Sequence, residues 1–275
     1  FFGVDYHSHL GTRRAGMVIC EGTGGFQKEI HSIENTPFRS RFDKDLERFH
    51  GTSGIGCISD TDPQPLLVRS HHGVFAITTV GIINNADELI ERYFERGGAQ
   101  FMAMSSGAVN NTELVAALIN QKEDLVEGIM YAQSVVEGSL TLLVMTEDGT
   151  IFAARDRMGR LPVLIGRDVE GAGYCISFES FVYHKLGYED AYELGPGGRR
   201  DEDLRVPVGL LRLPQLQLRG RERRGHALSQ RARHGARRGG GGDPARGGLR
   251  RRRARFGPAA RHRLRQRVRR HLRAP

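Results

Sequence analysis

Cysteine and histidine are the residue types in this sequence that could carry nucleophilic or metal chemistry. The three cysteines, Cys20, Cys57 and Cys175, are too scattered to form a CxxC metal pair and too few for a disulfide framework. Cys57 lies mid-chain in a strand-like run, where no free amine is available to act as its base. We therefore expect all three to be small buried hydrophobic residues in a reducing, cytoplasmic setting.

Two pairs of histidines are close enough in sequence to be considered as metal ligands. His71 and His72 are adjacent, and adjacent residues on a strand point to opposite faces, so turn and surface roles are expected. His7 and His9 have strand-like spacing, but no third ligand is near them in the sequence. The sequence therefore predicts no metal site.

The elements that would position these residues follow from the hydrophobic pattern. Runs rich in β-branched residues predict strands, and amphipathic stretches predict short helices, one of them capped by Asn111. Arg155 and Asp156 follow a predicted hairpin and are interpreted as a structural ion pair. Strands are expected over residues 13–20, 54–59, 66–69, 74–81, 140–146, 150–155, 163–167 and 174–178, and helices over 1–10, 43–49, 85–95, 111–120, 125–137 and 179–185. This succession predicts an α+β fold with two packed sheets and helices on the outer faces.

Charge and composition change abruptly near Gly197. The net charge of +9 hides two different parts: the segment after Gly198 holds 25 arginines, no lysine and 5 acidic residues, whereas the preceding part has 27 acidic and 16 basic residues. The basic segment lacks Ile, Met, Lys, Asn, Thr, Tyr, Cys and Trp, so it cannot bury enough apolar surface to fold. We expect one domain over residues 1–197 and a disordered, Arg- and Gly-rich tail over 198–275.

Several short motifs follow one another along residues 1–197. They are Gly11 with Ala15 and Gly16, Gly54-Ile55-Gly56, Gln64-Pro65, Gly81 with Asn85 to Leu89, Asn111 to Leu114, Ala153 to Asp156 with Gly159 and Pro162, Glu179-Ser180, and Gly195-Pro196-Gly197. In order and spacing they resemble the class II glutamine amidotransferase domain of the amidophosphoribosyltransferase family. The resemblance implies a four-layer αββα sandwich of the N-terminal-nucleophile hydrolase type.

The resemblance also implies which residues would bind substrate. In this family an N-terminal cysteine attacks glutamine, but Phe1-Phe2-Gly3 resembles the first helix, so the nucleophile is expected to be absent and no catalytic residue is predicted. Ser59 replaces the arginine that pairs with the glutamine carboxylate. Val80, before Gly81, replaces the oxyanion-hole asparagine. Asn111 replaces the aspartate that holds the substrate ammonium. We therefore expect glutaminase activity to be lost.

For the parent protein, the resemblance implies a glycosyltransferase of purine biosynthesis. It would make phosphoribosylamine from phosphoribosyl pyrophosphate and glutamine or ammonia, with Mg²⁺ on the pyrophosphate and no cofactor in this chain. We expect a homo-oligomer without membrane or specific nucleic-acid partners, and an inactive fragment. One alternative is a non-catalytic regulatory or assembly domain. An RNA-binding protein with a basic tail is ranked last, because Phe256 is the tail's single aromatic residue.

The tail can also be read as sequence translated in the wrong frame. With one base dropped, synonymous codons permit residues 201–212 to become MKICAFLWVYYG and residues 248–258 to become DYVAGVPDSGP. The recovered VPDSG resembles an element of the family's phosphoribosyltransferase domain. A single frame break after about Gly197 would explain the arginine surplus, the missing residue types and the family resemblance together.

Overall fold

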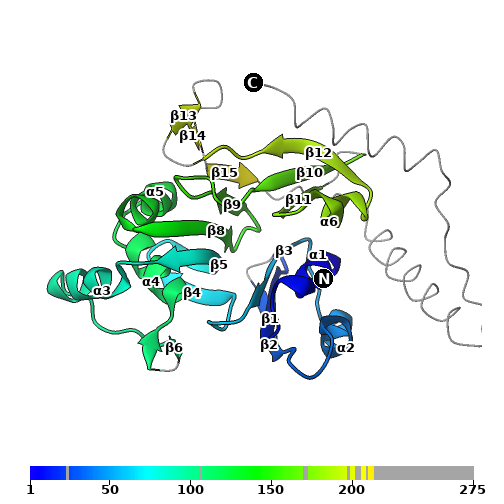
Figure 1. The fold of residues 1–275 in the computed structure, drawn as a ribbon, viewed down its shortest axis with the longest axis horizontal. Helices are drawn as coiled ribbons and strands as arrows, with labels where there is room; N and C mark the ends of the chain where they lie inside the picture. The colour runs from blue at the N-terminus through cyan, green and yellow to red at the C-terminus, as the bar shows by residue number, and fades with distance from the viewer. Residues whose placement is uncertain are drawn as a thin grey trace, which may run out of the picture. The chain divides into compact units, whose positions relative to one another are not determined.

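A five-stranded antiparallel sheet with the strand order β15-β9-β8-β5-β4 lies at the centre of the fold (Figure 1). The computed structural model describes residues 1–22, 25–105, 107–169, 173–196, 199–201, 206–208 and 210–213, and the tail from residue 214 lies outside them. The strands of this sheet are β4 (Leu66–Ser70), β5 (Gly73–Ile83), β8 (Gly138–Thr146), β9 (Ile151–Ala154) and β15 (Leu210–Leu213).

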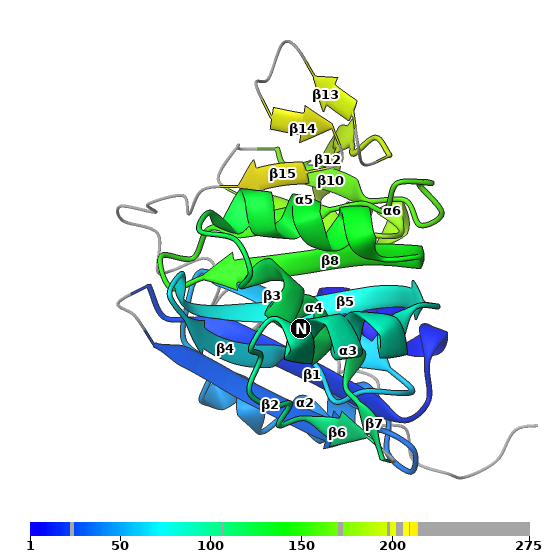
Figure 2. The ribbon, with the colours of Figure 1, turned by 90° about the vertical axis from the view of Figure 1, so that its left-hand side faces the viewer.

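Three helices cover one face of this sheet (Figure 2). They are α3 (Ala86–Glu95), α4 (Asn111–Ile119) and α5 (Leu125–Val135). Alternate residues of the strands, such as Phe75 and Ile77, meet buried helix residues such as Leu114 and Ile129 in the largest apolar core. The helices predicted for these segments are therefore confirmed.

The opposite face of the central sheet packs on two smaller antiparallel sheets. One has the order β2-β1-β3 and the other the order β11-β10-β12. Val18 and Ile55 meet Ala76 and Met145 between the sheets, and a neighbouring cluster joins Ala153 to the second small sheet. The strands are β1 (Arg14–Cys20), β2 (Phe26–Ser32), β3 (Ser53–Ser59), β10 (Leu164–Asp168), β11 (Tyr174–Ser177) and β12 (Tyr188–Glu193).

A second helical layer lies on the outer side of the small sheets. It contains α1 (Phe2–His7) and α2 (Phe38–Phe42) beside β1, and α6 (Ser180–His184) beside β10. Phe38 and Phe42 are both buried against Ala15 and Met17. The order of layers is therefore helix, sheet, sheet, helix, which confirms the predicted αββα sandwich (Figure 1).

Several elements differ from the sequence-based expectation. The helix predicted over 43–49 is only a 3₁₀ turn, η2 (Asp45–Glu47), and a similar turn, η1 (Ser8–Leu10), follows α1. The strands β2 and β12, the helix α2, and the hairpin of β6 (Met104–Ser105) and β7 (Ala108–Val109) were not predicted.

Strand pairing also continues beyond Gly197. The strand β13 (Arg199–Asp201) pairs with β14 (Val206–Val208), and β15 pairs with β9 of the central sheet. Backbone pairing therefore continues past residue 197, where the sequence predicted the start of a disordered tail. None of the described helices is both long and apolar enough to cross a membrane.

Candidate functional site

The substrate positions predicted from the sequence lie on three elements from different layers. Ser59 is the last residue of β3, Val80 and Gly81 lie near the end of β5, and Asn111 begins α4. Ile55 on β3 and Ala76 on β5 contribute to the core between the sheets. Ser59 follows Ile55 on β3, and Val80 follows Ala76 on β5, by an even number of residues, so each pair shares one face of its strand. Both positions therefore lie on the face between the two sheets.

A buried polar network holds the segments that carry these positions. The side chain of Gln64 donates to Thr79 O (3.0 Å) and accepts from Thr79 N (2.7 Å), so the chain after β3 is tied to β5. The hydroxyl of Thr79 shares a 2.7 Å hydrogen bond with that of Thr112, which ties β5 to α4. Asp62 accepts from Asn111 N at 3.1 Å. All the side chains that make these bonds are at least nine-tenths buried, so their polar groups need these partners.

Asn110, rather than the predicted Asn111, is the N-cap of α4. Its side-chain oxygen accepts from Thr112 N (2.8 Å) and Glu113 N (3.3 Å), and its side chain is fully buried. Its amide nitrogen also contacts Pro63 O at 3.5 Å. The sequence contains two consecutive asparagines, both of a type that favours the N-cap, and the structure shows which of them is the cap. Asn111 is exposed, so its side chain remains available to a ligand.

Gly81 has a structural reason for being glycine. Its φ is +152°, and a Cβ placed there would lie 2.0 Å from the backbone oxygen of Ser139 on β8. A side chain at this position would therefore push β8 away from β5. Val80 beside it offers only an aliphatic side chain, which cannot donate a hydrogen bond to an oxyanion.

Asp60 follows Ser59 in the sequence, and Arg14 lies opposite Ser59 in the β1–β3 ladder. Asp60 accepts from Thr12 N, at 2.6 Å, and from Arg13 N, at 2.8 Å, and these hydrogen bonds hold the pKa of its carboxyl below its ordinary value. Asp60 is therefore ionised at neutral pH. Arg14 faces Ser59 across the β1–β3 ladder and donates to Thr61 O at 2.9 Å. Sequence reasoning did not single out Arg14, because only strand register places it opposite Ser59.

The cysteines lie where the sequence predicted small hydrophobic residues. Cys20 and Cys57 are buried, and Cys175 is half-buried. Burial raises the pKa of the Cys57 thiol to about 12 and that of Cys175 to about 11. Both thiols are therefore protonated at neutral pH and are poor nucleophiles.

The two adjacent histidines do not point to opposite faces. His71 and His72 lie in the turn between β4 and β5, and their ring centroids are 3.9 Å apart. His71 Nε2 contacts Lys122 O at 2.8 Å, so this ring packs on the chain after α4. The predicted turn role is confirmed, but the predicted orientation is wrong because these residues are outside the strand.

Arg155 and Asp156 do not form the predicted ion pair with each other. Arg155 instead contacts Glu193 at 3.1 Å and donates to Leu194 O at 2.6 Å and Gly159 O at 2.8 Å. Asp156 is buried and accepts from Met158 N and Arg160 N. Both side chains fix the loop after β9, so their role is structural.

Comparison with known proteins identifies this fold. The family described as "Glutamine amidotransferase domain" matches residues 53–180. The amidophosphoribosyltransferase of Methanocaldococcus jannaschii is 30% identical over 207 residues, which are 72% of this chain and 42% of that protein. The mouse amidophosphoribosyltransferase is 26% identical over 215 residues, which are 69% of this chain and 41% of that protein.

Two solved structures have the same arrangement of elements. The Bacillus subtilis glutamine phosphoribosylpyrophosphate amidotransferase, complexed with ADP and GMP, matches with a TM-score of 0.62 at 24% identity, over 78% of this chain and 45% of that one. A structure titled as the allosteric regulatory enzyme of purine biosynthesis matches with a TM-score of 0.60 at 25% identity, over 71% and 42%. The chain thus spans less than half the length of these relatives. The fold, the matched domain and the relatives together show that the described part of this chain is a glutamine amidotransferase domain of the amidophosphoribosyltransferase family.

Proposed function

We propose that this domain belongs to an amidophosphoribosyltransferase-like enzyme of purine biosynthesis and does not hydrolyse glutamine. The parent enzyme would join ammonia to the ribose carbon of phosphoribosyl pyrophosphate and release pyrophosphate. Mg²⁺ would bind the pyrophosphate in the phosphoribosyltransferase part, to which none of the described residues is assigned. The relatives named above support the parent activity, and the residues around Ser59 support the loss of glutamine chemistry.

The observation that carries the proposal is the uncharged side chain at Ser59, the last residue of β3. A glutamine carboxylate needs a charge-assisted partner, and Ser59 supplies only a neutral hydroxyl. The adjacent Asp60 cannot supply the missing positive charge, because it is itself a carboxylate and is bound by Thr12 N and Arg13 N. Arg14 lies opposite Ser59 in the β1–β3 ladder and could bring a positive charge. One of its guanidinium N–H groups, however, already donates to Thr61 O.

The residues at Val80 and Asn111 also weaken the predicted glutamine site. Without a side-chain donor at Val80, the developing oxyanion would have the Gly81 backbone N–H as its remaining contact, and one lost oxyanion donor costs about 100-fold to 1,000-fold in rate. Asn111 brings no negative charge to the substrate ammonium. These changes reduce binding and turnover together.

The parent activity can be measured on the protein expressed from the complete open reading frame. The gene would be sequenced from upstream of Phe1 to beyond Pro275, and the complete open reading frame expressed. We expect phosphoribosylamine formation with ammonia and phosphoribosyl pyrophosphate, but not with glutamine as the nitrogen donor. Equal rates with glutamine and ammonia would contradict the proposal.

The second candidate function is a regulatory or assembly domain without any transferase activity in the parent. The same replacements at Ser59, Val80 and Asn111 favour it, because they would be tolerated where no catalysis is required. The ammonia-dependent assay separates the two: activity supports the first proposal, and its absence in a folded, full-length protein supports the second.

A further inference from the structure

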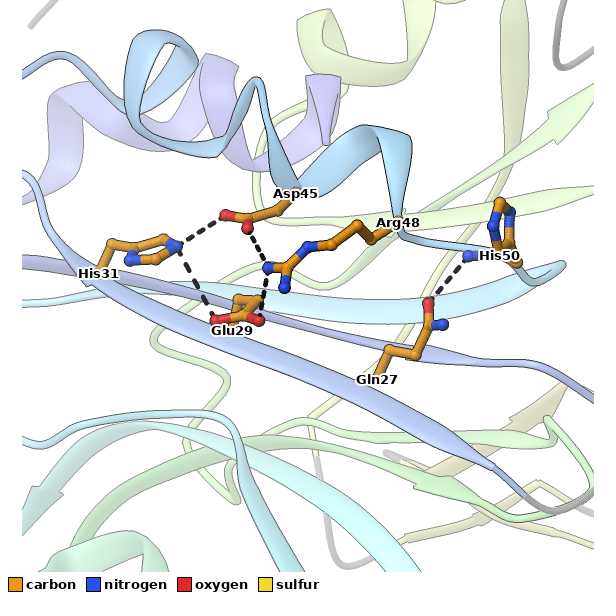
Figure 3. A network of polar contacts seen from close by, with 6 residues as sticks. All are labelled: Gln27, Glu29, His31, Asp45, Arg48 and His50. Carbon is orange, nitrogen blue, oxygen red and sulfur yellow. Dashed lines mark hydrogen bonds and ion pairs between the residues drawn. The ribbon is translucent and has the colours of Figure 1, made fainter.

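Two carboxylates, an arginine and a histidine meet where the chain after α2 crosses the polar face of β2 (Figure 3). Glu29 and His31 are two residues apart on β2 and therefore share one face. Asp45 comes from η2, and Arg48 follows that turn. Asp45 is only 5% exposed, although it lies at the surface side of the small sheet.

The potential ligand atoms of this cluster converge on one place. His31 Nε2 lies 2.7 Å from Asp45 Oδ2 and 4.0 Å from Glu29 Oε2. One ligand atom from each of the three residues can be chosen so that all lie within 4.8 Å of one another. The 2.7 Å and 4.0 Å separations lie on either side of the roughly 3.4 Å between two ligand atoms of a tetrahedral zinc ion with bonds of about 2.0–2.1 Å.

A cation already lies between the two carboxylates in this structure. The NH2 nitrogen of Arg48 is 2.8 Å from Glu29 Oε1 and 2.5 Å from Asp45 Oδ1. An arginine side chain is not deprotonated in proteins, so the guanidinium cannot leave by losing its charge. The Arg48 side chain is 64% exposed, however, and can move into water when another cation takes its place.

The geometry points to a zinc site formed by Glu29, His31 and Asp45, in which Arg48 is a built-in competitor of the metal. One imidazole and two carboxylates are a ligand set that suits Zn²⁺, and three protein ligands leave one position for water. A divalent ion would also neutralise both carboxylates, which Arg48 alone does not. Bound zinc would fasten η2 to β2.

Nothing in the sequence spacing indicates this site. His31 and Asp45 are 14 residues apart, and the strand β2 that aligns Glu29 with His31 was not predicted. The cluster depends on η2 folding back across the sheet. The cysteine thiols are weak competitors for zinc, because Cys57 and Cys175 are held protonated by burial.

The test is zinc binding to the whole chain, measured by isothermal titration calorimetry and by the shift of the unfolding temperature. We expect saturable binding of one equivalent, together with a higher unfolding temperature in zinc. His31→Ala should abolish both effects. His50→Ala is the matched control, because His50 lies beside the cluster but contributes only its backbone N–H, to Gln27 at 2.9 Å (Figure 3). This control variant should bind one equivalent of zinc with the same affinity as the unchanged chain.

Arg48→Gln gives the result that a purely structural ion-pair network would not produce. Removal of the competing cation should lower the zinc Kd by roughly tenfold, which corresponds to about 1.4 kcal/mol. This variant keeps all three ligands, so it remains informative if His31→Ala fails to fold. The site would be refuted if neither the unchanged chain nor Arg48→Gln bound zinc saturably, or if His50→Ala removed binding as His31→Ala does.

Discussion

At the scale of single residues, the cap of α4 is a position where neighbouring side chains have different roles. Asn110→Ala removes the hydrogen bonds to Thr112 N and Glu113 N from a fully buried site. We expect the free energy of unfolding to fall by about 1–2 kcal/mol. Asn111→Ala, one residue later and exposed, should change it by no more than about 0.5 kcal/mol. Urea unfolding of both variants measures the difference. Equal losses in the free energy of unfolding would contradict the assignment of Asn110 as the N-cap.

The buried thiol of Cys57 gives a second residue-scale prediction, on pH. Its pKa rises from an ordinary value of 9.0 to about 12 on folding, so the folded state holds this proton more tightly than the unfolded state. The stabilisation is complete below pH 9 and is lost as the pH rises toward 12. Cys57→Ala should therefore weaken the alkaline fall in the free energy of unfolding. Identical pH profiles for the variant and the unchanged chain, measured by urea unfolding, would contradict the burial.

Elements of the fold depend on close backbone contacts that a single glycine permits, and Gly81 on β5 is the sharpest example. Gly81→Ala meets the Ser139 oxygen, whereas Gly97→Ala, at a φ of +89°, has nothing within 4 Å of the new Cβ. We expect Gly97→Ala to cost about 1–2 kcal/mol through its backbone conformation alone. Gly81→Ala should cost clearly more, because β8 must also move. Chemical denaturation compares the two variants, and equal costs would rule out the close approach of β8.

The elements that the sequence predicted are those with strong apolar patterns, such as β5, β8 and α4. The strand β2 was not predicted because Gln27, Glu29 and His31 cover one face with polar groups, which are partly buried by α2, η2 and the chain that follows η2. The helix α2 is a single short turn whose buried residues, Phe38 and Phe42, are stabilised by β1 rather than by helix propensity. Tertiary contacts therefore decide these elements. The same holds for the site: Ser59, Val80 and Asn111 were named from the family resemblance, but the hydrogen bonds of Gln64 and Thr79 depend on the folded structure and were not predicted.

At the scale of the whole molecule, the composition of the basic tail leads to a prediction about the gene. A single lost or gained base is expected in the codons for residues 194–204, with VPDSG restored downstream. The strand β13 lies within this window, and β14 and β15 lie downstream of it, so a frame break there would replace the residues of β14 and β15. Sequencing both strands of this region decides the question. An unbroken frame as written would make the tail part of the protein and would favour the non-catalytic alternative.

The loss of the glutamine site is the central claim at this scale, and glutamine binding to the whole chain tests it most directly. The comparison is between the unchanged chain and the double variant Ser59→Arg with Asn111→Asp, which restores both charges. A control carries Ser53→Arg with Asn111→Asp, since Ser53 is at the other end of β3. Isothermal titration calorimetry should detect glutamine binding only in the first double variant. Saturable, tight binding of glutamine by the unchanged chain would contradict the account.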